Sequence, residues 1–242
     1  MRIRKALDRE SGQVEVETAI VMPMVIFLLL GLIQLGLLHQ ARIMAKYAAY
    51  RAVRAGAVYN FDMDRMEKAA VAAALPVLSY RSGDAELLGR TDGATQWIQK
   101  WTTHGFITNR MLDIMLPYVV VRRCGPLRSE VSAYQYGQNV VAFDHPGMAG
   151  KKGKLRIEVQ LNYRLMIPFV DWVIYRMWTG ANITRELHLG HGPATWSNTG
   201  GYSINGVHVV PIRAQYSMHL MSDALVDKFP EQCECLAGGG CQ

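Results

Sequence analysis

Residues 12–38, GQVEVETAIVMPMVIFLLLGLIQLGLL, decide the fold of this chain, because two carboxylates stand directly before an uninterrupted apolar run. The run begins at Ala19 and ends at Leu38, carries no charge, and has Gln34 as its single polar side chain. A helix of that length rises about 30 Å, which is the thickness of a hydrocarbon core. The segment is therefore predicted to cross a membrane once.

A cleaved secretory signal is the weaker interpretation of the same run. The apolar region of such a signal is shorter, and a cleavage site of small residues follows it. Residues 38–42, Leu-His-Gln-Ala-Arg, form no convincing site of that kind. A buried helix of a soluble core is disfavoured by the length of the run.

Basic residues flank the run on both sides and bear on its orientation. Because positive charge is retained on the cytoplasmic side of a span, the basic start predicts a cytoplasmic N-terminus and an extracytoplasmic head. Basic residues beyond the run weaken that prediction. The two groups are Arg2, Arg4, Lys5 and Arg9 before the run, and Arg42, Lys46, Arg51 and Arg54 after it.

The sequence around Gly12 resembles the signal of a class of type IV pilins. In that class a prepilin peptidase cuts on the cytoplasmic side, after the glycine, and the fifth residue of the cleaved chain is acidic. The new first residue here would be Gln13, and the fifth is Glu17. The continuation ETAIVMPMVIFLLLGLIQLG, with AKYAAYRAVRAGAV after it, is similar to the TadE-like pseudopilins of tight-adherence (Flp/Tad) pili.

This resemblance is strong over roughly residues 10–58 and weaker at KLRIEVQLNYRLMIP and the apolar segment after it. The chain departs from the common pattern at Thr18, where an aromatic residue often follows the glutamate. The departure bears on the efficiency of processing rather than on the resemblance itself.

The resemblance implies a part in a pilus-based secretion and adhesion machine rather than catalysis. The implied role is a minor pseudopilin, either a structural component or an assembly or tip factor, since the head is large for a major repeating pilin. The implied organisation is a cytoplasmic leader over residues 1–12, a transmembrane and stalk helix over 13–59, and an extracytoplasmic head with a cysteine-containing tail over 60–242. The expected partners are prepilin peptidase, the other minor and major pilins of the machine, and inner-membrane lipid.

The chemistry of Glu17 supports an assembly role without reference to any family. Cleavage after Gly12 creates an α-amine on Gln13, and neither this cation nor the Glu17 carboxylate enters hydrocarbon cheaply alone. Pairing Glu17 with the amine of a neighbouring subunit would neutralise both and would select one stagger between helices. The alternative is that Glu15 and Glu17 are interfacial carboxylates near the start of the helix, where acidic groups are favoured. Both interpretations can hold together.

Two further features mark the long helix. Pro23 removes a backbone donor near the start of the span, which predicts either a kink or an ordinary first-turn proline. Beyond the span, alanines at 45, 48, 49, 52 and 55 form a narrow stripe of small side chains at helical spacing. The stripe predicts close packing, with the head covering the upper half of the helix and other subunits covering the lower half.

The rest of the chain predicts an α+β fold, in which helices pack on a small antiparallel sheet. Residues 155–165 alternate apolar and polar side chains, as do residues 212–220, so both are predicted as half-buried strands. Residues 130–141 are expected to form a third strand. Residues 168–178 are expected to form a short helix over the sheet, whereas 147–153 and 190–201 are predicted as a turn-rich linker and a surface loop.

Helices are also expected between the stalk and the sheet. Asp62 or Asp64 can cap a helix that runs to about Pro76, with Glu67 in its first turn. Further helical segments are expected over residues 95–101 and 109–116.

Four cysteines are expected to stabilise the tail: Cys124, Cys233, Cys235 and Cys241. An even count outside the cytoplasm predicts disulfides, for example one from Cys124 to the tail and one within the tail, although four cysteines allow three pairings. The C-x-C spacing is a poor match to a zinc site, so no metal is expected.

No catalytic or nucleotide-binding motif is found, and no cofactor is expected. The formal net charge of +6 is modest for 242 residues and shows no concentrated nucleic-acid footprint. The alternative hypothesis is a protein with one membrane span whose extracytoplasmic domain binds a ligand or is an enzyme, unrelated to pili.

Overall fold

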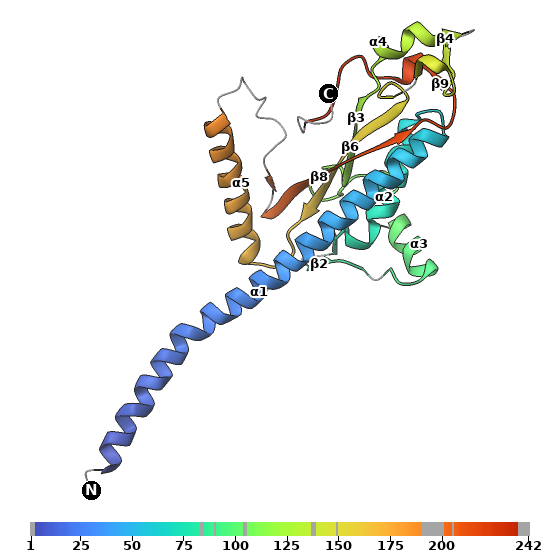
Figure 1. Cartoon of the computed structure of the whole chain (residues 1–242). Helices are drawn as coiled ribbons and strands as arrows, with labels where there is room; N and C mark the ends of the chain where they lie inside the picture. Colours follow the sequence, from blue (N-terminus) through green and yellow to red (C-terminus); the bar gives the residue numbers. More distant parts are fainter. Residues whose placement is uncertain are drawn as a thin grey trace.

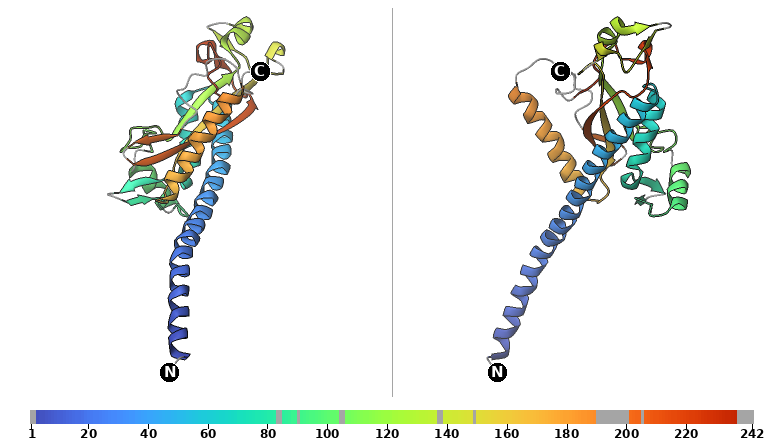
Figure 2. Two further views of the ribbon diagram at one scale, coloured as in Figure 1. Left: turned by 90° about the vertical axis from the view of Figure 1, so that its left-hand side faces the viewer. Right: turned by 45° about the vertical axis from the view of Figure 1, so that its right-hand side comes forward.

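The computed structural model describes residues 3–82, 85–89, 91–103, 106–136, 139–148, 150–189, 201–204 and 206–236. The fold is α+β, as predicted (Figure 1). Helix α1 (Ile3–Val58) is one long helix that projects from a head of helices and antiparallel strands. Turned views show the N-terminal half of α1 standing clear of the head from each side (Figure 2).

The central sheet is the element against which the longest helices of the chain pack. Its four antiparallel strands lie in the order β3 (Val119–Gly125), β6 (Lys154–Arg164), β8 (Val207–His219) and β7 (Tyr202–Ile204). The two alternating segments predicted from the sequence form β6 and β8, which pair along the whole of β6, from Lys154 opposite His219 to Arg164 opposite Val209. The other neighbour of β6 is β3, a strand that the sequence analysis missed.

The upper half of α1 packs on this sheet. One face of β6 presents buried apolar side chains of the common core, and burying each such side chain stabilises the fold by roughly 1.5–3 kcal/mol. The facing side chains of α1 are small, which lets the helix approach closely. The buried residues of β6 are Leu155, Ile157, Val159, Leu161 and Tyr163, and the alanines of α1 are Ala41, Ala45, Ala48, Ala49 and Ala52.

Gly56 marks a close approach of α1 to its neighbours. A Cβ at this position would lie 2.7 Å from the side chain of Leu155 and 2.7 Å from the sulfur of Met66. A larger residue would therefore push α1 away from both β6 and the next helix. The expected stripe of alanines thus serves the interior of the head, with Ala55 at its partly exposed edge.

Helix α2 (Met63–Ala74) packs beside α1 on the same side of the sheet. Asp62 is its N-cap, since the carboxylate accepts a hydrogen bond from the backbone N–H of Asp64 at 3.1 Å. Glu67 lies beyond the first turn, contrary to expectation. The short helix η1 (Leu75–Val77), the hairpin of β1 (Tyr80–Ser82) and β2 (Ala85–Leu87), and α3 (Ala94–Thr103) follow, and α3 agrees with the predicted helical segment.

Two predicted elements are wrong. Residues 130–141 form no continuous strand but fold into α4 (Arg128–Val131), η2 (Ser132–Tyr134), β4 (Gln135–Tyr136) and β5 (Val140–Val141). Residues 109–116 form turns, because Asn109 and Met115 have positive φ angles of 52° and 56°, which a right-handed helix does not allow. The Asn109 side chain pairs with Val119 instead: its Nδ2 donates to the Val119 carbonyl at 2.6 Å, and its Oδ1 accepts from the Val119 N–H at 2.9 Å.

A small second sheet lies at the end of the head farthest from the N-terminus (Figure 1). It has the order β4-β5-β9, where β9 is Ala224–Leu225. Short helices flank it, η3 (Pro146–Met148) in the expected turn-rich linker and η4 (Val226–Lys228) after β9. The C-terminal end of α1 is held here, because the N–H of Met221 and the hydroxyl of Ser222 both donate to the carbonyl of Ala57.

Helix α5 (Val170–Leu189) is longer than the predicted helix over residues 168–178. It begins beside α1 at the near end of the sheet and extends toward the far end of the head (Figure 1). Its contacts are with β8 and α1, including a stacked pair of rings, Tyr175 and His208, 4.7 Å apart. The predicted loop at residues 190–201 lies outside the described residues, apart from Gly201.

Candidate functional site

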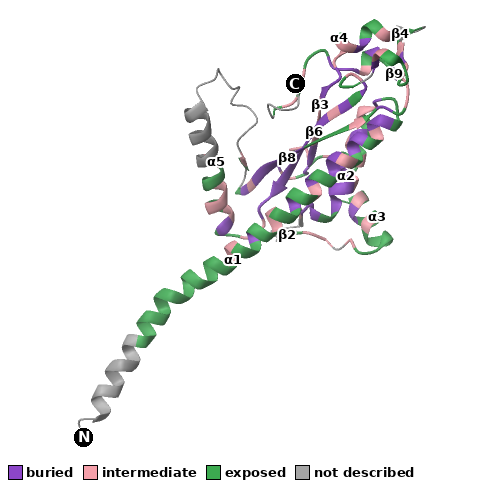
Figure 3. Ribbon diagram, in the orientation of Figure 1, coloured by how far each residue is buried: buried purple, intermediate pink, exposed green. Residues whose placement is uncertain are grey.

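The exposed half of α1 is the first candidate site. Its apolar side chains from Val14 to Leu35 are largely exposed, whereas one face of the helix is buried from Ala41 onward (Figure 3). Residues Val14–Val58 contain a window long and apolar enough to cross a membrane, and 6% of that window is buried within the head. A surface of this kind is costly in water and needs lipid or protein around it.

The predicted processing and assembly residues all lie on this exposed half. Gly12 and Gln13 lie within the backbone of α1, whose side chains are described from Val14 onward. Glu15 and Glu17 are exposed. Because successive residues of a helix are turned by about 100°, these two carboxylates point to nearly opposite sides of α1. A single neighbouring helix can therefore meet only one of them.

The predicted span is continuous helix from Ala19 to Leu38. Pro23 lies in the interior of α1 rather than in a first turn. Gln34 is fully buried near the Leu38 end of the span, where its Oε1 accepts a hydrogen bond from the backbone N–H of Ile167 at 3.1 Å. The sequence analysis identified Gln34 as the one polar residue of the run, but its partner, 133 residues away, had no sequence signal.

The cysteine-containing tail is bonded to the sheet. Cys124, in β3, forms a disulfide with Cys235, and their Cα atoms are 5.2 Å apart. Cys233 is also disulfide-bonded, whereas Cys241 lies outside the described residues. Beside the disulfide, the Arg123 guanidinium contacts the Glu234 carboxylate at 2.5 Å. Burial alone would raise the pKa of Glu234, but its side-chain and backbone hydrogen bonds with Arg123 outweigh burial and lower that pKa.

The tail contacts one end of a polar layer on the face of the sheet that α1 does not touch, at Arg122 and Glu158. This polar layer consists of Arg122, Glu158, Gln160, Asn162, Arg164 and Gln215, with Asp113. Strand β6 is therefore buried on both faces, and the prediction that it is half-buried is wrong. The alternating polar residues of β6 meet partners from distant segments instead of solvent.

Glu158 is the centre of the polar layer and is fully buried. Its carboxylate lies 3.7 Å from the Arg122 guanidinium, and it accepts hydrogen bonds from Gln215 Nε2 at 3.1 Å and from the Leu236 N–H at 3.4 Å. At the near end of the sheet, Arg164 forms two hydrogen bonds with Asp113, at 2.7 and 3.1 Å. Because each of these charges is paired within the layer, a structural role fits the polar layer better than a ligand-binding site does.

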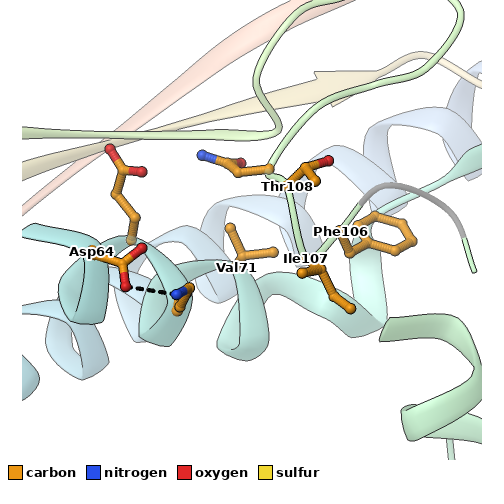
Figure 4. Close-up of a pocket in the computed structure, with 8 residues that line it drawn as sticks. Asp64, Val71, Phe106, Ile107 and Thr108 are labelled. Atoms are coloured by element: carbon orange, nitrogen blue, oxygen red, sulfur yellow. Dashed lines mark hydrogen bonds and ion pairs between the residues drawn. The ribbon is translucent and has the colours of Figure 1, made fainter. Parts of the chain in front are cut away.

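A pocket of about 300 Å³ lies between α2 and the turn at residues 106–109 (Figure 4). Its polar groups include Asp64, which forms an ion pair with Lys68 at 2.6 Å, and Glu67, whose pKa is raised by burial and by the neighbouring Asp64. Nothing in its lining resembles a nucleophile held by a base. Among the described residues, no three histidine, cysteine or acidic side chains are grouped so that they could hold a metal.

Comparison with known proteins bears on α1 rather than on the head. A family described as "TadE-like protein" matches residues 12–54. The N-terminal segment is TadE-like. The match covers the exposed half of α1 and most of the half that packs on the sheet. No curated protein and no solved structure matches the chain.

The TadE-like match and the apolar helix together support a membrane protein associated with a tight-adherence pilus, and they confirm the resemblance found in the sequence. The match points to a structural component that associates with other pilus components. One long apolar helix near the N-terminus fits a single-span membrane anchor.

Proposed function

We propose that the chain is a minor pseudopilin of a tight-adherence pilus machine, acting as a structural component or as an assembly or tip factor. The observation that carries the proposal is the exposed apolar half of α1, which coincides with the TadE-like match. Such a helix can be stored in the inner membrane and later pack among equivalent helices in a filament. The large folded head supports a minor component rather than a short repeating subunit.

In this proposal, prepilin peptidase removes residues 1–12 on the cytoplasmic side, and Gln13 becomes the first residue. The amine of Gln13 and the carboxylate of Glu17 then lie at the inner edge of the bilayer, with the head outside. An unpaired charge at that depth is costly. The amine of an adjoining subunit neutralises Glu17 when the two helices pack at the correct stagger, so the ion pair selects the register of assembly.

Glu15 provides a matched control for this mechanism. It has the same side chain, lies two residues earlier and is also exposed, but it points to nearly the opposite side of α1. If charge near the membrane edge were all that mattered, the two glutamates would be interchangeable. If pairing selects register, only Glu17 is essential.

The experiment measures processing and incorporation separately in cells with an active machine. Mass spectrometry of the mature chain should give a start at Gln13, and Gly12→Ala should leave the leader in place. Glu17→Ala should be cleaved normally but be lost from complexes with other pilus subunits, whereas Glu15→Ala should be retained.

A mature chain that keeps Met1, or one cut beyond Leu38, would instead support an anchored ligand-binding or enzymatic domain unrelated to pili. Normal incorporation of Glu17→Ala would count against the pairing mechanism, even if processing occurs after Gly12.

A further inference from the structure

The turn between β6 and α5 lies where α1 leaves the head. We call residues 166–172 the basal turn, because they form the end of the head nearest the exposed half of α1 (Figures 1 and 3). The turn is fixed there by the hydrogen bond from the Ile167 N–H to Gln34. Its position along α1 is therefore defined.

That position places the basal turn at the level of the membrane span. Gln34 lies four residues before Leu38, the outer end of the apolar run. At about 1.5 Å per residue, the backbone of Ile167 lies roughly 6 Å to the membrane side of that end. At the same level on α1, Leu32, Ile33 and Leu35 are exposed apolar side chains that require a hydrocarbon environment.

The basal turn exposes large apolar side chains at this level. Phe169 is 80% exposed and Trp172 is 54% exposed. Phe169 also has a φ of 70°, a backbone conformation that is unfavourable for a bulky residue. A strained backbone that holds an aromatic ring away from the core suggests that the ring has a purpose outside the head.

We propose that the basal turn inserts into the outer interface of the phospholipid bilayer, with Phe169 and Trp172 at the boundary between headgroups and acyl chains. Tryptophan favours this boundary, because its ring is apolar and its N–H remains near polar groups. The Arg176 guanidinium lies 5.7 Å from the Trp172 ring and is exposed, so it can reach lipid phosphate. The head thus has a second membrane contact besides α1.

Lipid fits this surface better than a protein partner, because the basal turn is continuous with a helix face already in the bilayer. A protein partner would have to bind at the depth of the span itself. Arg42 and Lys46 are exposed on α1 a few residues beyond Leu38, where they can contact headgroup phosphates. Contact with lipid phosphate then explains why Arg42 and Lys46 lie on the outer side of the span, where the positive-inside rule does not place basic residues.

The test is quenching of tryptophan fluorescence by brominated lipid. The full chain is reconstituted in vesicles of phosphatidylethanolamine and phosphatidylglycerol, with phospholipid brominated either near the headgroup end or near the methyl end of the acyl chain. Emission should be quenched more by the shallow bromines than by the deep ones. Trp172→Phe should lose most of this quenching, whereas Trp97→Phe, in α3, should keep it.

A second variant separates membrane insertion from a structural role. Phe169→Gly removes the ring and suits the positive φ, so the head should remain folded and be at least as stable in detergent, yet Trp172 should be quenched less by the shallow bromines. Loss of stability in detergent would indicate that Phe169 serves the core.

Equal quenching of Trp172→Phe and the unaltered chain would overturn the proposal. It would also be overturned if Trp172 emission ignored the bromines and responded to the protein-to-lipid ratio instead, since that result would indicate a second copy at this surface. Neither measurement requires cleavage after Gly12, so the inference stands or falls separately from the pilin function.

Discussion

Gln34 and Ile167 are joined by a hydrogen bond across 133 residues of chain, and this contact ties the exposed apolar half of α1 to the base of the head. Gln34 is fully buried, so its Oε1 accepts the backbone N–H of Ile167 out of contact with water. Together with the contacts of Ala57 at the far end of the head, the bond holds α1 at both ends of the sheet.

Gln34→Leu should loosen the base of the head. Leucine cannot accept the Ile167 N–H, and a buried donor without a partner costs about 1–3 kcal/mol. Hydrogen exchange of residues 165–170 in the detergent-solubilised chain should accelerate, while exchange in β8 away from the base changes little. Gln40→Leu, at an exposed position of the same helix, is the control. Equal exchange in both variants would show that the contact carries no stability.

Glu158→Ala should be strongly destabilising, because it leaves the Arg122 charge without its carboxylate in a mostly buried layer. Breaking a buried pair costs roughly 3–5 kcal/mol. Glu158→Gln retains an acceptor for Gln215 and should cost less. Urea unfolding followed by tryptophan fluorescence measures both losses.

The control for Glu158 is Glu231→Ala, which removes an exposed ion pair with Arg128 and should cost less than about 1 kcal/mol. If the alanine variants at positions 158 and 231 unfold at similar urea concentrations, the polar layer does not stabilise the fold.

The disulfide between Cys124 and Cys235 should stabilise the head by restricting the unfolded chain. Its sequence separation is 111 residues, and closing a loop of that size contributes about 4–5 kcal/mol in the chain-entropy description. The double variant Cys124→Ser, Cys235→Ser should unfold at lower urea concentration and become sensitive to protease near residue 230. Retention of protease resistance would indicate that the Arg123 and Glu234 contacts alone hold the tail.

Lys100 should make stability rise with pH in an alkaline window. Burial lowers the pKa of its ammonium group from 10.5 to about 8, while its Nζ donates to the carbonyls of Leu75, at 2.7 Å, and Leu88. Between these pH values the unfolded chain binds the proton and the folded chain releases it, so the free energy of unfolding increases as pH rises. Below pH 8 both states are charged, and the burial penalty is complete.

The measurement is thermal unfolding of the unaltered chain and of Lys100→Met from neutral pH to pH 10.5. The stability of the unaltered chain should increase relative to Lys100→Met as pH rises through the window. Lys68→Met, which removes an exposed lysine paired with Asp64, is the matched control. A constant difference between the unaltered chain and Lys100→Met would refute the assignment.

The sequence predicted the elements whose patterns are local. Residues 19–38 are uniformly apolar and have the length of a membrane-spanning helix. In β6, the alternation of apolar and polar residues determines which side chains contact α1. The same alternation misled the prediction for the other face, because Glu158 and Arg164 are buried by Arg122, Gln215 and Asp113, which are distant in sequence. Nothing local distinguishes a polar residue facing solvent from one facing a later partner.

Two other failures have a similar cause. In the segment at 109–116, the side chain of Asn109 forms hydrogen bonds with the backbone of Val119, and the segment forms turns instead of a helix. The periodicity of the sequence does not predict such hydrogen bonds. The exposure of Phe169 and Trp172 depends on where the start of α5 lies against α1 and the sheet, which the apolar composition of residues 168–178 could not specify.

Helix α1 passes from the exposed segment into the head without a break, so the chain has no tether about which the head could swivel. The direction in which each surface of the head faces is therefore set by the rotation of the span about its own axis. One residue inserted between Pro23 and Gln34 would turn the head by about 100° relative to Glu17 and raise it by about 1.5 Å. In a protein with a flexible linker such an insertion would not change the orientation of the head. Here it would turn the whole head toward a different neighbour.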